Sequence, residues 1–423
     1  MKRKLYTFLM SLMLIGCMFL STACNSSSQG KESTESTQSE ESTDSAQGEE
    51  STDSTESTQK EESTVPVKRD TKLLSGSFLQ SWICRDWTYT RWEQELTAMK
   101  ELGMDFIIIQ SVTDQSYRLG SAEKQDWASY TFKGQTSLYP SEIEELKDAI
   151  VSSQNNGDAL ELLLKAAKEK DMKVYIGLLS DDRWWDFGWG TPKLPEGKTD
   201  PATESYFATW CEYNGKLNGQ MITEIWERYG EEYGEQIAGW YYYNEIWNID
   251  VACLGADDKA YATCIGDNIN HMLDAINGAC PEKPLMLSPY FNISISTAKQ
   301  YRNFWIDIFR VANFRAGDIF APQDCVGAKN LSIKNMEKWI SALKEAADTE
   351  EGMRFWVNNE SFTSDFQPAD ISRFIEQIET SEKYAETHIT FSWNHYYNPV
   401  NKASAESYNN ELIEYLKYRL EIE

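Results

Sequence analysis

The stretch IAGWYYYNEIWN, residues 237–248, passes directly from a buried-strand pattern into a polar pair. Residues 237–243 are β-branched, small and aromatic, which is typical of a strand that is covered on both faces. Asn244 and Glu245 follow where such a strand would end. A carboxylate in that position is costly to desolvate unless it has a partner or a chemical task. The stretch therefore predicts a central strand with a candidate functional residue at its carboxyl end.

Eight stretches in the chain share this strand-like character, and helical patterns lie between them. One helical example places Leu160, Leu163, Leu164 and Ala167 on one face. Strands that are apolar on both faces and alternate with helices predict a parallel sheet covered by helices. Eight such units close into a barrel, so we expect an α/β fold, a (β/α)8 TIM barrel, as a single globular domain over residues 67–423. An open doubly wound sheet is the alternative, but no glycine-rich phosphate-binding turn follows the first strand. The predicted strands are 76–80, 105–110, 173–179, 237–244, 284–290, 318–323, 353–359 and 388–394.

The first 66 residues are predicted to lie outside this domain. Residues 1–23 combine a basic start with a short apolar run, which is typical of an export signal. Cys24 follows small residues and precedes polar sequence, so it resembles the lipid-bearing cysteine of bacterial lipoproteins. Cys17 is a competing match, and an ordinary cleaved signal is the remaining alternative. Residues 24–66 consist mostly of Ser, Thr, Glu and Gln and predict a disordered tether. We expect an exported protein, lipid-anchored to the bacterial cell membrane and facing outward.

The charge and the cysteines limit the kinds of partner. A formal net charge of −27 argues against nucleic acid and other polyanions. The cysteines after Cys24 are widely spaced, without a CxxC motif, so we expect neither a structural zinc nor a cofactor. An exported protein permits disulfides, and Cys264 could pair with Cys253 or with Cys280.

Polar and aromatic residues recur where the predicted strands end. In barrels of this class, the chemistry sits at the carboxyl ends of the strands and in the loops that follow, and the loops 111–157 and 180–201 are long. Amides and hydroxyls hydrogen-bond to sugar hydroxyls, and aromatic rings stack on pyranose faces, so we expect a carbohydrate partner. The candidate substrate-binding residues are Gln80, Trp82, Gln110, Trp184, Asn244, Trp247, Tyr290, Gln323, Trp393 and Asn394.

Two glutamates, Glu245 and Glu360, stand at the ends of the fourth and seventh predicted strands, and each follows an Asn. Two carboxyl groups that flank a glycosidic bond are the minimum for its hydrolysis. One must carry a proton for the leaving oxygen, while the other attacks the anomeric carbon or activates water. The structural alternatives are a hydrogen-bonded strand-end carboxylate for Glu245 and a helix-capping turn for Glu360.

This arrangement resembles clan A of the retaining glycoside hydrolases. The resemblance implies that Glu245 is the acid/base, that Glu360 is the nucleophile, that Asn244 binds the hydroxyl beside the anomeric carbon, and that Trp393 floors the subsite. The openings GSFLQSW (76–82) and LGMDFIIIQ (102–110) resemble more narrowly the family catalogued as domain of unknown function 4434, over about residues 73–400. Gln323 departs from the Tyr or His that many clan members have on the sixth strand.

These observations together predict a retaining glycoside hydrolase that acts on a β-linked, neutral poly- or oligosaccharide at the cell surface. The alternative is a non-catalytic surface glycan-binding lipoprotein that uses the same barrel. A processing enzyme for the cell's own exopolysaccharide is a third interpretation.

Overall fold

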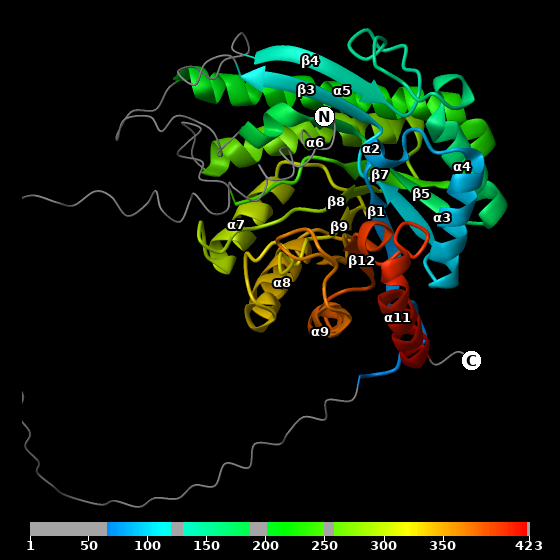
Figure 1. The fold of residues 1–423 in the computed structure, drawn as a ribbon. Helices are drawn as coiled ribbons and strands as arrows, with labels where there is room; N and C mark the ends of the chain where they lie inside the picture. Colours follow the sequence, from blue (N-terminus) through cyan, green and yellow to red (C-terminus); the bar gives the residue numbers. More distant parts are fainter. Residues whose placement is uncertain (1–65, 120–129, 187–200, 249–257, 421–423) are drawn as a thin grey trace, which may run out of the picture. The chain divides into compact units, whose positions relative to one another are not determined.

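The computed structural model describes residues 66–119, 130–186, 201–248 and 258–420 (Figure 1). The chain divides into two compact units, residues 1–67 and 68–423. Every helix and strand described below belongs to the second unit. The predicted signal at 1–23, the lipidation site Cys24 and nearly all of the tether at 24–66 lie outside the described residues.

The main sheet is a closed barrel of parallel strands. Its order is β10-β9-β8-β7-β5-β2-β1-β12-β11. β10 and β11 are two segments of one strand, interrupted at Trp356, and they pair with β9 and β12 respectively. The two edges therefore meet, and the sheet closes as eight strands, which confirms the predicted TIM barrel. The segments are β1 Leu74–Leu79, β2 Phe106–Ile109, β5 Lys173–Gly177, β7 Ile237–Tyr242, β8 Leu285–Leu287, β9 Ile319–Phe320, β10 Arg354–Phe355, β11 Val357–Glu360 and β12 His388–Phe391.

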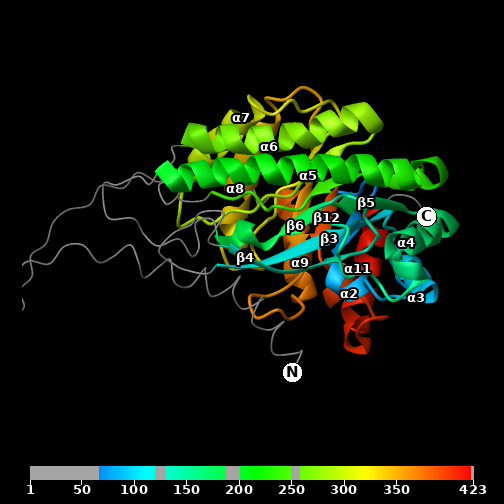
Figure 2. The ribbon, with the colours of Figure 1, turned by 90° about the horizontal axis from the view of Figure 1, so that it is seen from above.

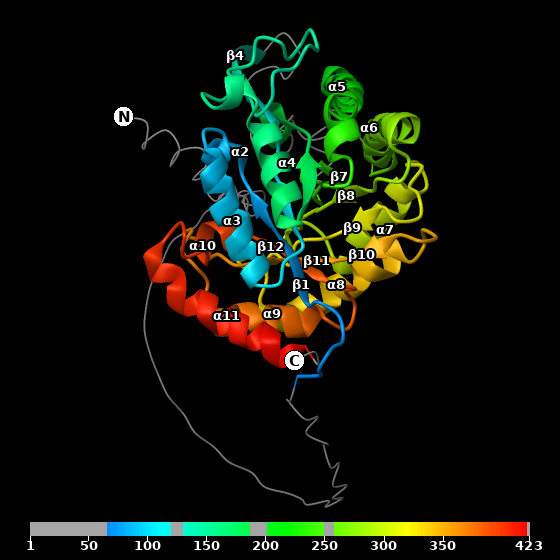
Figure 3. The same cartoon turned by 90° about the vertical axis from the view of Figure 1, so that its right-hand side faces the viewer.

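Helices form a ring around these strands (Figure 3). The two longest, α5 and α6, run side by side (Figure 2). Among the described residues, no helix is both long enough and apolar enough to cross a membrane. The ring consists of α3 Tyr89–Glu101, α4 Ala159–Lys170, α5 Pro201–Tyr233, α6 Asp258–Ala279, α7 Ala298–Phe309, α8 Ile333–Ala347, α9 Ile371–Ser381 and α11 Glu406–Arg419, and the short helices α2 Ser81–Cys84 and α10 Trp393–Tyr396 follow β1 and β12.

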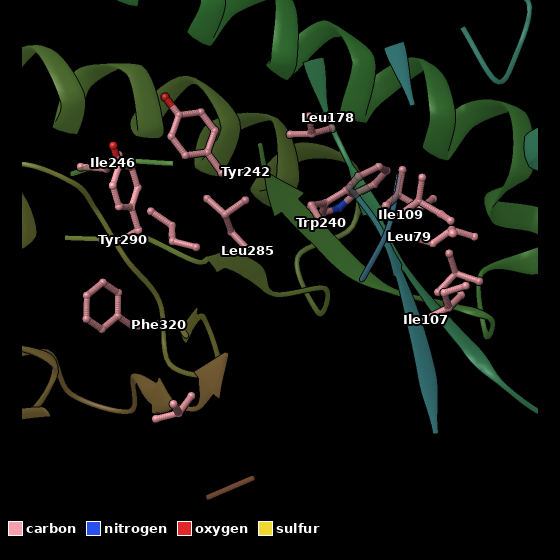
Figure 4. Close-up of a cluster of buried hydrophobic side chains, with 14 of the residues drawn as sticks. Leu79, Ile107, Ile109, Leu178, Trp240, Tyr242, Ile246, Leu285, Tyr290 and Phe320 are labelled. Atoms are coloured by element: carbon pink, nitrogen blue, oxygen red, sulfur yellow. The ribbon is translucent and has the colours of Figure 1, made fainter. Parts of the chain in front are cut away.

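Side chains alternate between the inside and the outside of the barrel, as strands require. The outward set, which includes Ile107, Trp240 and Phe320, packs against the helices (Figure 4). The inward set forms a second, separate apolar cluster. Continuing this alternation toward the carboxyl ends places Gln80, Gln110, Gln323 and Glu360 on the inward face. The inward cluster comprises Phe78, Phe106, Ile108, Tyr175, Tyr241, Met286, Ile319, Ala321, Trp356 and Ile389.

A second sheet occupies the region that the sequence predicted as long loops. β3 Thr113–Leu119 pairs antiparallel with β4 Tyr130–Ser137 and parallel with β6 Leu179–Asp181. A buried ion pair joins Asp181 to Arg183, whose guanidinium lies 3.8 Å from the ring centre of Tyr117 on β3. The prediction missed these strands because β3, with the sequence TDQSYRL, is mostly polar and carries little apolar alternation.

The suggested pairing of Cys264 with Cys280 is wrong. Cys280 is a buried free thiol that accepts a hydrogen bond from the indole nitrogen of Trp240 at 3.3 Å. Cys253, the other suggested partner, lies outside the described residues.

The two ends of the barrel domain are tied together by a buried charge. The backbone N–H of Arg69 donates to the carbonyl of Arg419 at 2.7 Å. The guanidinium of Arg419 is fully buried and donates to both carboxylate oxygens of Glu382 at 2.6 Å. Arg69 also reaches Glu382, at 3.6 Å. Glu382 thus links the first strand region to the last helix.

Replacing this carboxylate is expected to destabilise the domain. Glu382→Ala leaves the buried Arg419 guanidinium without its bidentate acceptor, and we expect the free energy of unfolding to fall by about 3 kcal/mol. The matched control is Glu345→Ala, which breaks the more exposed pair with Arg302 and should cost less than about 1 kcal/mol. Urea denaturation measures both, and equal losses would contradict the assignment.

Candidate active site

Glu245 lies just beyond the end of β7, on the inward side of the barrel. Its negative charge contributes to the raised pKa values of Tyr241 and Tyr243, after the larger effect of burial, which places it beside the inward face of that strand. Burial raises the pKa of Glu245 to about 7, and a hydrogen bond with the side chain of Gln323 opposes this rise. Glu245 therefore holds its proton more tightly than an ordinary glutamate does.

Glu360 is the last residue of β11, and its side chain is 2% exposed. Its carboxylate Oε2 accepts a hydrogen bond from the backbone N–H of Ala328 at 2.7 Å. Burial, followed by the charge of Asp324, raises the pKa of Glu360 well above its usual range, and the charge of Glu245 adds to the rise. The N–H of Ala328 and the charge of Arg373 act in the opposite direction.

The two glutamates are electrostatically coupled although they are distant in the chain. Glu245 raises the pKa of Glu360, and both carboxylates, after burial, raise the pKa of the Cys325 thiol. Gln323, from the end of β9, contacts Glu245. The structure thus brings residues that follow three different strands to one end of the barrel.

Side-chain amides and hydroxyls line the barrel near these carboxylates. Asn358 donates to the hydroxyl of Ser288 at 3.0 Å, and Gln323 donates to the Ser288 carbonyl at 3.1 Å. Within the described part of the chain, Gln80 Oε1 and Asn358 Oδ1 are buried acceptors without a hydrogen-bond partner. Gln110, 5% exposed, lies on the same inward face by alternation. Unmet buried acceptors suit a ligand that carries hydroxyl groups.

His395 on α10 and Trp82 on α2 lie close together. Their ring centres are 6.5 Å apart. Burial, with a smaller effect of Lys402, lowers the pKa of His395 to about 3, so this imidazole is neutral near pH 7. Trp82 is 50% exposed, so half of its side-chain surface faces solvent. A neutral imidazole and an exposed indole fit contacts with an uncharged sugar.

The structure contradicts the roles assigned to Trp393 and Asn394. Trp393 is fully buried, and its indole N–H donates to Asn409 of α11 at 2.8 Å. Asn394 is also fully buried and donates to the carboxylate of Glu95 on α3. The chain turns into α10 directly after β12, which directs both side chains into the helix layer. The inward aromatic of this strand is Phe391, which packs against the inward cluster.

Asn244 also faces the helix layer rather than the inside of the barrel. Its amide donates to Asn214 of α5 at 3.0 Å, and Asn214 in turn accepts from Asn218 and Asn268. The expected contact of Asn244 with a sugar hydroxyl stays a prediction, and this orientation of the amide does not support it. The physical reason is alternation, because the neighbour of an inward-facing residue points outward.

The remaining predicted platforms pack within the protein. Trp184 is 1% exposed, and its ring centre lies 5.5 Å from that of Trp210. Trp247 stacks on Tyr290, with ring centres 5.5 Å apart and ring planes within 10°, and both are buried. Of the four predicted tryptophans, Trp82 keeps half of its surface exposed.

Two carboxylates beside the site were not selected from the sequence. Asp114, on β3, accepts hydrogen bonds from Ser81 and Ser111 at 2.5 and 2.6 Å. Burial raises its pKa, and these hydroxyls oppose the rise. Asp324 is fully buried next to Glu360. Both follow the end of a barrel strand closely, and this position was the available signal.

Comparison with known proteins identifies a family. The family model described as domain of unknown function (DUF4434) matches residues 74–403. No curated protein matches the chain. A crystal structure described as a putative α-L-fucosidase from Bacteroides thetaiotaomicron is 23% identical, with a TM-score of 0.58, and the match covers 86% of this chain and 98% of that one.

Two more distant structures are a β-glucosidase from Thermotoga maritima and a GH113 β-1,4-mannanase. The first is 10% identical, with a TM-score of 0.43 and coverage of 83% of this chain and 99% of that one. The second is 9% identical, with a TM-score of 0.43 and coverage of 82% and 99%. The fucosidase-like structure supports the barrel fold alone. Because the family model spans most of the chain, this protein belongs to the DUF4434 family.

Proposed function

We propose that this protein is a retaining glycoside hydrolase in which Glu245 is the acid/base and Glu360 is the nucleophile. The observation that carries the proposal is the pair itself. Two glutamates from the ends of β7 and β11 lie in one buried, polar-lined end of the barrel, and the charge of Glu245 adds to the rise in the pKa of Glu360. Burial raises both pKa values, so the pair keeps a proton to higher pH than ordinary glutamates do, and the proposed acid step needs that proton on Glu245.

The proposed reaction proceeds in two steps. In the first, a Glu360 carboxylate oxygen attacks the anomeric carbon while Glu245 donates its proton to the departing glycosidic oxygen. The glycosidic C–O bond breaks, and a covalent glycosyl–Glu360 ester forms. In the second step, Glu245, now ionised, takes a proton from water, which attacks the same carbon and releases Glu360. The assignment of the two roles follows the resemblance to clan A.

The chemistry of the barrel lining supports a neutral ligand that carries hydroxyl groups. It combines unmet acceptors on Gln80 and Asn358, a neutral His395 and an exposed Trp82. The acidic chain also disfavours anionic polymers. We propose a β-linked poly- or oligosaccharide, with the β-linkage taken from the clan resemblance. An export signal and a lipid on Cys24 would place the enzyme at the outer face of the bacterial membrane.

One observation favours the second candidate, a glycan-binding protein without catalysis. Glu360 is 2% exposed, and Gly327 and Ala328 pack against its carboxylate, which restricts the approach of a sugar carbon. Binding of unmodified oligosaccharides with no product after long incubation would select this candidate.

Replacing the proposed nucleophile tests the enzyme assignment. In an assay with aryl β-glycosides and soluble β-glucans and β-mannans, Glu360→Ala should lower kcat at least about 10³-fold, because the covalent route is lost. Glu227→Gln, on the exposed surface of α5, is the matched control and should keep the wild-type rate. An unchanged rate in Glu360→Ala would remove Glu360 from the mechanism.

The raised pKa of Glu245 predicts the alkaline side of the pH profile. Glu245 must be protonated to assist departure, so kcat/KM should fall as the pH rises above about 7. With a 2,4-dinitrophenyl glycoside, whose leaving group needs no proton, this fall should be absent from the first chemical step. Glu245→Gln should lose the alkaline fall and about 10²–10⁴-fold of the rate on unactivated substrates. An alkaline fall that persists in Glu245→Gln would assign it to another group.

The stereochemistry of the product provides an independent test. Two successive displacements at the anomeric carbon restore its configuration, so the sugar first released from a β-glycoside should be the β-anomer. Proton NMR during the first minutes of the reaction distinguishes it from the α-anomer. Initial release of the α-anomer would exclude the covalent intermediate and replace it with direct attack by water.

A further inference from the structure

Asp324 is a fully buried carboxylate directly behind the residue proposed as nucleophile. Its Oδ1 accepts from the backbone N–H of Val326 at 3.0 Å. Its Oδ2 accepts from the Asn359 side chain at 2.9 Å, from the backbone N–H of Glu360 at 3.3 Å and from the Gln377 side chain. Four N–H donors thus replace water around this carboxylate and offset the cost of burying it.

The segment 324–328 folds around the Glu360 side chain. It begins with Asp324, whose Oδ1 fixes the turn at Val326, and it passes through Cys325 at a φ of +57°. A side chain on Gly327 would place its Cβ 2.9 Å from both Cβ and Oε2 of Glu360. The next residue, Ala328, donates its N–H to Oε2. One carboxylate therefore holds both the backbone of Glu360 and the turn that binds the Glu360 carboxylate.

We propose that Asp324 is a positioning residue: it fixes the Glu360 backbone and the 324–328 turn relative to each other, so that Ala328 binds Oε2 and Oε1 is the oxygen presented for attack. The role of Oε1 as the attacking atom rests on the proposed function. The placement of the Glu360 carboxylate by Asp324 does not, because it follows from the hydrogen bonds alone.

Asp324 acts on Glu360 through its charge as well. Burial first, and then the Asp324 carboxylate, raises the pKa of Glu360, whereas Arg373, which donates to the Glu360 carbonyl at 3.1 Å, lowers it. The remaining titratable groups coupled to Glu360 come from the other elements around it, namely Glu245 after β7, Cys325 after β9 and Tyr396 on α10.

The charges of Asp324 and Arg373 predict the direction in which the pKa of Glu360 changes in each variant. Asp324→Asn removes a neighbouring negative charge, so the Glu360 carboxylate becomes easier to form and its pKa should fall. Arg373→Met removes a positive charge, so the pKa of Glu360 should rise. The pKa of Glu360 reports the Asp324 charge beside it, and kcat reports the orientation of the Glu360 carboxylate.

The pKa can be measured without a substrate. The full chain is labelled with [5-13C]glutamate, and the Glu360 carboxyl signal is identified by its loss in Glu360→Gln. Titration should show that the pKa of Glu360 falls in Asp324→Asn and rises in Arg373→Met. It should not change in Glu376→Gln, which alters an exposed carboxylate on α9, the helix that carries Arg373. With an aryl β-glycoside, Asp324→Asn should also lower kcat about 10-fold or more, because the attacking oxygen is less well oriented, and shift the acid side of the profile to lower pH.

The outcomes separate this inference from the proposed function. An unchanged Glu360 pKa in folded Asp324→Asn overturns the inference, even if the protein hydrolyses glycosides. If the expected pKa shifts occur in a protein that hydrolyses no glycoside, the placement of Glu360 by Asp324 is supported and the proposed hydrolase function is overturned. If Asp324→Asn does not fold, Gly327→Ala tests the same turn, because its Cβ displaces Oε2 from Ala328 and should raise the pKa of Glu360. An unchanged value there overturns the inference as well.

Discussion

Burying several carboxylates at one end of a closed barrel is the physical constraint on which this site depends. Glu360 and Asp324 are withdrawn from water almost completely, and Glu245 is desolvated enough to raise its pKa to about 7. Such groups are tolerated only where N–H donors replace the lost water. Asp324 takes four donors, Glu360 takes the N–H of Ala328, and Glu245 takes a contact with Gln323. The burial that costs stability also raises the pKa values of Glu245 and Glu360.

Closure of the barrel brings these carboxylates together. Each strand is short, and its side chains alternate, so a residue two positions beyond an inward apolar side chain also faces inward. Trp356, directly before β11, faces inward, and Asn358 and Glu360 follow on β11 at the same spacing. A slip of one residue in this register would turn Glu360 into the helix layer, where Asn359 now lies. The register of β11 against β12 therefore fixes the chemistry of the site as much as the fold.

The parts of the structure that could be predicted from the sequence are those with a repeated apolar signal. All eight barrel strands could be located because each is apolar on both faces, and the two glutamates were found because they end two of those strands. Trp393 could not be placed in this way. Trp393 lies two positions after the inward-facing Phe391, so alternation alone would place it inward. The turn into α10 redirects it, and this turn depends on a tertiary contact with Asn409. Asn244, in contrast, could have been assigned outward from alternation alone, since Glu245 beside it faces inward.

The two sides of the barrel mouth are built differently, and this difference has a consequence for how each can change. On one side, Glu360 accepts a hydrogen bond from the backbone N–H of Ala328, and the turn that carries Ala328 is itself held by the side chain of Asp324. On the other side, the region of the β3–β4–β6 sheet is joined to the barrel by the backbone N–H of Val112, which donates to the carbonyl of Gly177, and Asp114 with its two serines adds side-chain contacts. A substitution at Asp324 is therefore expected to move the Glu360 carboxylate, because the turn and the Glu360 backbone share this one acceptor. A substitution of Ser81 or Ser111 removes one of the two hydroxyls on Asp114 and leaves the backbone bond to Gly177 in place, so the second sheet is expected to tolerate it better.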